Sequence, residues 1–74
     1  MNKLYYISDC RVLMDSVPLF DGKNARDAIM KYFKHKGQSH KIKLDKKGNI
    51  SAVPVIEMNG MKIKKGRYVW FKIL

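Results

Sequence analysis

One segment of the chain repeats its hydrophobic positions with helical spacing. Between residues 24 and 36 the apolar side chains fall at i, i+3, i+4, i+7 and i+8, as Ala25, Ala28, Ile29, Tyr32 and Phe33. This spacing is typical of a helix with one buried face. Asn24 is a good N-cap with Asp27 in the first turn, and Gly37 suits the left-handed position after the last turn. The pattern predicts one main helix over about residues 25–36.

The other hydrophobic runs are short and rich in β-branched and aromatic residues, which is typical of strands. We expect strands over residues 3–7, 39–44, 50–57 and 68–74. Residues 8–10 are expected to form a turn or bulge. Two further extended segments, Arg11–Met14 and Val17–Phe20, complete either two short strands or one long bent strand.

Two local signals refine this pattern. Pro54 inside the run 50–57 argues for an edge strand or a bulge, because proline cannot donate to the sheet ladder. Asn59-Gly60 predicts a type I′ hairpin turn between Ile56–Met58 and Met61–Ile63. The expected fold class is α+β, with a small antiparallel sheet of about four or five strands covered by one helix. The 74 residues are expected to form a single domain.

The positive charge is concentrated in the second part of the chain. The net charge at pH 7 is +10, and residues 1–30 contribute none of it, because four basic and four acidic side chains balance there. Residues 31–74 carry twelve basic side chains against Asp45 and Glu57. Such asymmetry indicates a basic surface that faces a polyanion, although a merely solvated lysine-rich surface is the alternative.

A nucleic acid is the polyanion we expect, since a pI near 10.0 is typical of proteins that bind one. RNA is favoured over DNA as the partner. The predicted nucleic-acid-binding residues are the cations around the predicted strands: Lys36, Lys41, Lys43, Lys46, Lys47, Lys62, Lys64, Lys65 and Arg67. Tyr68 or Trp70 would add base stacking if the nucleic acid is single-stranded.

His40 is the candidate catalytic residue. Histidine is the usual general acid–base near neutral pH, and Lys36, Lys41 and Lys43 flank this one in the sequence. A neutral imidazole there could take the proton from a ribose 2′-hydroxyl, while the lysines stabilise the charged phosphorane. The alternative is a structural role at the start of a strand.

The composition excludes several other classes of function. One cysteine and two histidines without a carboxylate cluster match no usual metal site, so we expect no metal and no cofactor. Cys10 cannot form a disulfide within the chain, which indicates a reducing compartment. No apolar run approaches the roughly 20 residues of a membrane span, and the first residues lack a signal-peptide core. The expected protein is small and cytoplasmic.

Several short motifs follow one another in residues 37–66: Ser39-His40, a strand over Lys41–Leu44, Gly48, Val53-Pro54-Val55 and Ile63-Lys64-Lys65-Gly66. In this order and spacing they resemble HicA-type toxins, which are small basic proteins with a double-stranded-RNA-binding-domain-like fold. The resemblance implies an endoribonuclease that cuts messenger RNA with His40, in a turn shaped by Gly37 and Ser39, and a HicB-type antitoxin as partner. It also implies a final helix, whereas the composition of residues 68–74 favours a strand.

Three functions therefore stay open. The first is a basic nucleic-acid-binding module, and the second is a HicA-like endoribonuclease toxin. The third is a non-catalytic interaction protein, such as a phage-type inhibitor of a host nucleoprotein complex. We expect no membrane partner, and either a monomer or a small homo-oligomer formed through an uncovered sheet edge.

Overall fold

The computed structural model describes residues 2–12 and 18–74, and the predictions for residues 13–17 lie outside this part. Seven elements follow one another: β1 (Lys3–Asp9), β2 (Leu19–Gly22), α1 (Ala25–His35), β3 (Ile42–Leu44), β4 (Ile50–Met58), β5 (Met61–Lys64) and β6 (Val69–Ile73). All strand pairs are antiparallel, in the order β2-β1-β4-β6-β3, and β5 pairs with β4. The α+β prediction is confirmed, and the described residues form six strands rather than four or five.

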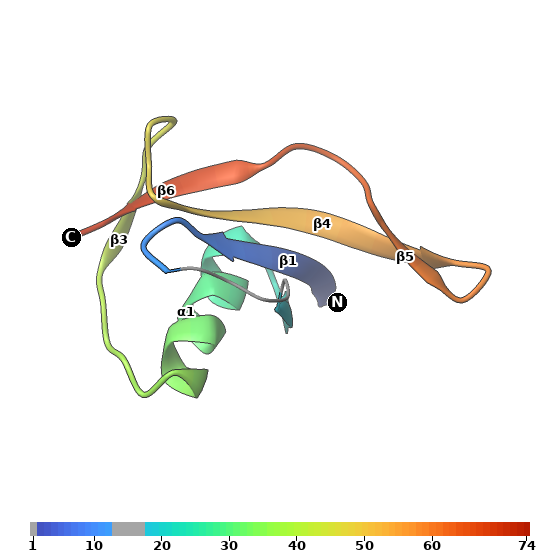
Figure 1. Cartoon of the computed structure of the whole chain (residues 1–74), viewed down its shortest axis with the longest axis horizontal. Coiled ribbons are helices and arrows are strands. Elements are labelled where there is room, and N and C mark those ends of the chain that lie inside the picture. Colours follow the sequence, from blue (N-terminus) through green and yellow to red (C-terminus); the bar gives the residue numbers. More distant parts are fainter. Residues whose placement is uncertain (1, 13–17) are drawn as a thin grey trace.

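The sheet curls around α1, which packs against one face (Figure 1). Residues opposite each other in a ladder share a face, so the register assigns every strand residue to the helix side or to the helix-free side. Ile7 and Ala52 lie opposite each other on the helix side and are both fully buried. They pack with the predicted helix stripe, whose five residues are all buried. The core therefore lies between α1 and the inner face of the sheet.

The ends of α1 match their predicted caps. The Asn24 side chain accepts a hydrogen bond from the backbone N–H of Asp27 at 2.9 Å. At the other end Gly37 has a φ of 70°, and the backbone N–H of Gln38 donates to the carbonyl of Phe33 at 2.9 Å. This six-residue hydrogen bond is the Schellman arrangement, which needs a left-handed residue at the Gly37 position. The helix then ends in a sharp turn toward β3.

Pro54 lies in a central strand, so the prediction of an edge is wrong. Its carbonyl accepts a hydrogen bond from the backbone N–H of Lys65 at 2.8 Å, which turns its nitrogen toward the same side. On that side the β6 ladder ends at Ala52 and the β5 ladder begins at Val55. Residues 65–68 leave the sheet between them. The missing N–H of proline falls in this gap, where no strand needs it.

The strand predictions for residues 3–7, 39–44, 50–57 and 68–74 are confirmed with shifted boundaries. The extended segment expected over Arg11–Met14 is wrong for its described residues, since Arg11 and Val12 lie in a turn and a bend. The last segment forms strand β6, not a helix, and the hairpin turn has positive φ values at Asn59 and Gly60, as a type I′ turn requires. The expected turn at residues 8–10 is wrong in part, since Ser8 and Asp9 continue β1 opposite β4.

The turn between β3 and β4 depends on close approach to β6. A Cβ atom added at Gly48 would lie 2.0 Å from the carbonyl oxygen of Phe71. That same carbonyl accepts a hydrogen bond from the backbone N–H of Asn49 at 3.0 Å. Only glycine fits at position 48. The hydrogen bond from the next residue, Asn49, to the Phe71 carbonyl then holds the turn against β6.

We expect Gly48→Ala to lower the free energy of unfolding by about 2–3 kcal/mol, because the added methyl forces the turn away from β6. Urea denaturation followed by far-UV circular dichroism measures the change. Lys47→Ala, one position earlier and exposed, is the matched control and should stay within about 0.5 kcal/mol of the native chain. Equal stability of the two variants would contradict the steric role of Gly48.

Candidate functional site

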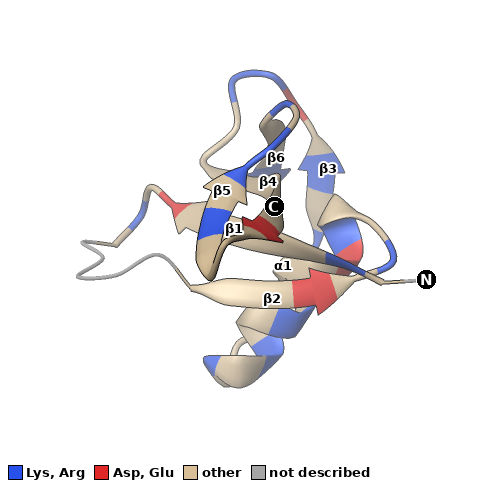
Figure 2. Cartoon of the chain, turned by 90° about the vertical axis from the view of Figure 1, so that its right-hand side faces the viewer, with Lys and Arg blue, Asp and Glu red and all other residues tan. Residues whose placement is uncertain are grey.

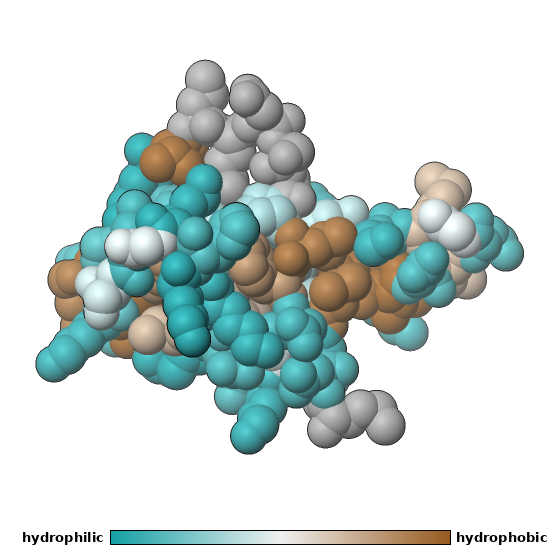
Figure 3. All heavy atoms as spheres, turned by 90° about the horizontal axis from the view of Figure 1, so that it is seen from below, coloured by the Kyte–Doolittle hydropathy of each residue, from teal (hydrophilic) through white to brown (hydrophobic). Residues whose placement is uncertain are grey.

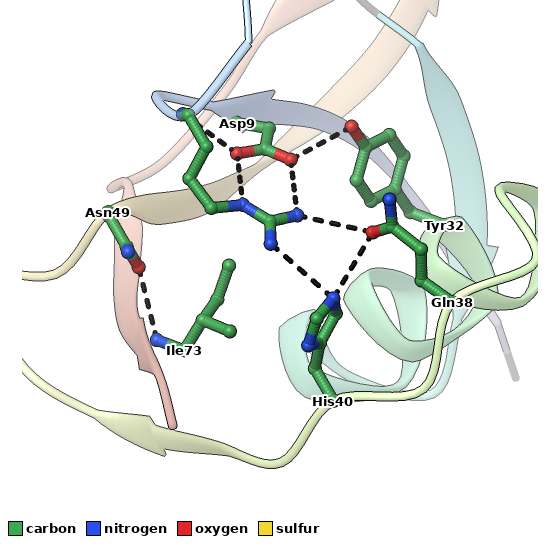
Figure 4. Close-up of polar contacts among 7 residues, drawn as sticks. Asp9, Tyr32, Gln38, His40, Asn49 and Ile73 are labelled. Carbon is green, nitrogen blue, oxygen red and sulfur yellow. Dashed lines mark hydrogen bonds and ion pairs between the residues drawn. The ribbon is translucent and has the colours of Figure 1, made fainter.

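Asp9 at the end of β1 is the centre of a polar cluster (Figure 4). Its side chain is 1% exposed. One carboxylate oxygen accepts from the backbone N–H and Nε of Arg11, both at 3.0 Å. The other accepts from Nη2 of Arg11 at 2.9 Å and from the Tyr32 hydroxyl at 3.0 Å. The cluster joins β1, the following turn and α1.

These bonds set the pKa values of the cluster. Burial alone would raise the pKa of Asp9, but the hydrogen bonds from Arg11 and Tyr32 outweigh it, so the pKa lies below its ordinary value. Burial and the bond to the Asp9 carboxylate raise the pKa of Tyr32 to about 12. At neutral pH Asp9 is therefore a carboxylate and Tyr32 a neutral donor.

Arg11 connects this buried carboxylate to His40. Its Nη2 donates to Oε1 of Gln38 at 3.3 Å, and its Nη1 lies 3.4 Å from Nε2 of His40. The same Nε2 lies 3.2 Å from the Gln38 oxygen. A proton on Nε2 would donate to Gln38, whereas an unprotonated Nε2 accepts from Arg11, so the tautomer selects one bond. With either tautomer, Nε2 of His40 makes its hydrogen bond within the protein.

The His40 ring is half-buried rather than open to solvent. It meets the fully buried Phe33 ring edge to face, with 4.9 Å between centroids. Around it lies an open hollow of about 510 Å³, lined by Met30, Phe33, Lys34, Gly37, Gln38, Ser39 and His40. His40 therefore combines a packing role with access to an open hollow.

The register separates His40 from two of the lysines that flank it in sequence. Lys43 lies opposite Lys72 in the β3–β6 ladder, on the helix-free side. His40 contacts Phe33 of the helix and therefore lies on the helix side. Lys41 is two residues before Lys43, so strand alternation places both lysines on the helix-free side. The expected grouping of His40 with strand lysines is therefore replaced by a grouping with Arg11 and Gln38.

The helix-free side of β6 collects a second set of side chains. Trp70 lies opposite Ser51, and Lys72 lies opposite Lys43. Tyr68 precedes the strand, and its ring is nearly parallel to that of Trp70, with 6.4 Å between centroids and 23° between planes. Aromatic and basic side chains thus follow one another along one strand.

Lys64 of β5 extends this set. Its Nζ donates to the Tyr68 hydroxyl at 2.8 Å and lies 5.5 Å from the centre of that ring. Lys62 lies on the same face, opposite Glu57. Figure 2 shows basic segments on β3 and β5, whereas β2 carries an acidic segment, at Asp21. The basic surface therefore follows the β3, β5 and β6 part of the sheet.

The remaining predicted cations lie in loops and at the end of the helix. All nine predicted lysines and arginines are exposed. Lys46 and Lys47 lie in the β3–β4 turn, Lys65 and Arg67 lie between β5 and β6, and Lys36 caps α1 near the Tyr32 ring. Sequence reasoning missed Lys72, although its alternation with Trp70 would have placed it on the same face. It also missed Arg11, for which the one indication in the sequence was an acidic residue, Asp9, two positions earlier.

No sequence family, curated protein or solved structure matches this chain. Within residues 2–12 and 18–74, no three His, Cys, Asp or Glu side chains gather as a metal site would require. The helix in this part of the chain is too short and too polar to cross a membrane. The function must therefore be argued from the two side-chain sets themselves.

We expect Asp9→Asn to lower the free energy of unfolding by about 3 kcal/mol at pH 7, because Arg11 then loses its buried partner. The depressed pKa makes the Asp9 contribution complete above about pH 4 and lost as the pH falls through the folded value. Denaturation between pH 2 and 7 should therefore show a steep acid limb in the native chain and a flatter one in the variant.

Asp21→Asn is the control, because Asp21 is exposed and its ion pair with Lys31 is long, at 3.5 Å. Its effect should stay below about 1 kcal/mol. A native-like acid limb in Asp9→Asn would contradict the role of the buried carboxylate.

Proposed function

We propose that the helix-free face of β6 and its neighbours binds single-stranded nucleic acid, with RNA as the expected form. The observation that carries this proposal is the order Tyr68, Trp70, Lys72 along one face, with alternate side chains roughly 7 Å apart. Aromatic rings stack on bases and lysines bind the phosphates between them. Two aromatic side chains followed by a lysine on one face offer both kinds of contact to one extended chain.

The pairing of Lys43 with Lys72 supports the proposal. Like charges directly opposite in an antiparallel ladder destabilise the sheet. An anion placed between the two ammonium groups removes this repulsion and gains two charge-assisted hydrogen bonds. The pair is thus unfavourable in the free protein and favourable in a complex with a phosphate backbone.

The binding experiment uses the intrinsic fluorescence of Trp70, the one tryptophan in the chain. We expect a ten-nucleotide uridine strand to quench this emission, with an affinity that falls steeply between 50 and 200 mM salt. Lys43→Ala/Lys72→Ala should reduce the slope of log K against log salt by about 1.4, because two phosphate contacts are lost. A deoxythymidine strand of the same length compares DNA with RNA.

Lys23→Ala/Lys34→Ala is the control, since it removes the same charge from exposed positions beside and on the helix. It should leave the Trp70 quenching in place and change the slope less. If both double variants lost the same amount of affinity, the effect would follow from net charge alone, which would contradict a defined binding face. Absence of salt-dependent binding would reject the proposal.

A second candidate function is RNA cleavage at His40. One observation favours it: the imidazole and the Arg11 guanidinium lie 3.4 Å apart beside an open hollow. Proton transfer would run through Nδ1, which makes no hydrogen bond within the described residues, while Nε2 carries a proton and donates to Gln38. Such a base would take the proton of a ribose 2′-hydroxyl.

We expect His40→Ala to abolish cleavage of a labelled messenger RNA, with a fall of at least about 100-fold. His35→Ala is the matched control, because His35 is the other histidine and lies at the end of α1, where its ring contacts Phe20. It should cleave at the native rate. If the native chain cleaves nothing, or if both variants cleave equally, His40 has no catalytic role and the binding function stands alone.

A further inference from the structure

The β4–β5 hairpin extends beyond the helix and leaves one sheet edge open. Figure 1 shows the hairpin at the end of β4 that is furthest from β3 and β6. In the described part of the chain, β5 pairs with β4 alone, and all four of its residues are exposed. The other side of β5 is therefore a free edge, which is a surface that pairs readily with another strand.

The direction of the backbone groups on this edge follows from one hydrogen bond. The N–H of Lys65 donates to the carbonyl of Pro54, so Lys65 faces β4. Backbone groups alternate along an antiparallel strand, and Ile63 and Met61 therefore also face β4. The N–H and C=O groups of Lys62 and Lys64 point outward. The edge thus offers two donors and two acceptors in alternation.

The side chains of β5 divide into an apolar face and a basic face. Met61 lies opposite Met58 and Ile63 opposite Ile56, on the side of the sheet that continues the core. These four side chains are between 37% and 67% exposed. Seen from the helix side, Figure 3 shows apolar atoms continuing from the body of the protein into the hairpin. Lys62 and Lys64 occupy the other face.

A second copy of this chain fits the edge poorly. Antiparallel pairing of β5 with itself, centred on Lys62, places Lys62 opposite its own copy. Centring on Ile63 instead places Lys62 opposite Lys64 of the copy. Each register opposes like charges on the basic face, which destabilises the pair. The edge lysines therefore disfavour self-association and leave room for a partner of opposite charge.

A nucleic acid also leaves part of this edge unsatisfied. Phosphates only accept hydrogen bonds, so they would leave the outward carbonyls of Lys62 and Lys64 unpaired. They would also cover the apolar side chains of Met61 and Ile63 with charge. An extended polypeptide supplies both donors and acceptors, and its alternate side chains reach both faces.

We propose that the β5 edge binds an extended segment of a partner protein whose residues alternate between acidic and apolar. The acidic side chains lie beside Lys62 and Lys64, and the apolar ones lie beside Met61 and Ile63. This interaction does not rest on nucleic-acid binding, because it depends on the backbone edge of β5 and on Met61 and Ile63. It shares Lys62 and Lys64 with the basic surface.

The test uses a seven-residue peptide that alternates glutamate and valine, blocked at both ends, with ¹⁵N-labelled protein. We expect hydrogen exchange of the Lys62 and Lys64 amides to slow at least tenfold when the peptide is saturating. The Ile63 amide already faces β4 and serves as an internal reference that should change little. A peptide of the same composition, with its glutamates grouped at one end, should bind at least tenfold more weakly.

Charge reversal supplies the second arm. The variant Lys62→Glu/Lys64→Glu should no longer bind the peptide that alternates glutamate and valine. It should instead bind a peptide that alternates lysine and valine. Lys46→Glu/Lys47→Glu, in the exposed β3–β4 turn, carries the same charge change and should keep the original preference. Alternate N-methylation of the peptide along the pairing edge should abolish binding, whereas N-methylation of the other edge should not.

Several results would overturn the proposal. Binding of the grouped peptide as tightly as the alternating one would reduce the interaction to simple charge attraction. Peptide binding without protection of the Lys62 and Lys64 amides would place the contact elsewhere. Protection of these amides by a uridine strand but not by the peptide would make the edge part of a nucleic-acid surface.

Discussion

The buried carboxylate of Asp9 is the constraint on which the arrangement of the chain depends. Desolvating a charged group is costly, and the donors of Arg11 and Tyr32 offset that cost here. To supply them, the turn after β1 must fold back and α1 must lie against the end of that strand. Arg11 then reaches Gln38 and His40, so the loop after the helix is positioned by the same charge. A small domain with a modest core gains a unique arrangement from this cluster.

Local patterns predicted the elements well, because their signals lie within a few residues of one another. The apolar spacing and caps of α1 and the Asn59-Gly60 turn are of this kind, and both are confirmed. Ser8 and Asp9 were expected in a turn because polar residues usually lie at the surface. Asp9 is buried because Tyr32, 23 positions later, donates to it. No local pattern encodes such a pairing.

The candidate site was predictable in its composition but not in its grouping. Sequence proximity placed His40 among Lys36, Lys41 and Lys43. Strand alternation and the curl of the sheet instead bring Arg11 to His40, while Lys43 meets Lys72 on the opposite face. Register decides which side chains share a surface, and register depends on long-range pairing. The chain thus separates a histidine on the helix side from a basic aromatic strip on the other.

The gap beside Pro54 gives β4 two regions of unequal cooperativity. Its first half is held by strands on both sides and by the helix, whereas its second half is held mainly by the hairpin. Because no strand hydrogen bond bridges the gap at the proline nitrogen, the hairpin can open without breaking the ladder between β4 and β6. Local opening of this kind costs less than global unfolding. The hairpin can therefore adapt its twist to what it contacts while the Asp9 cluster and the core keep their native arrangement.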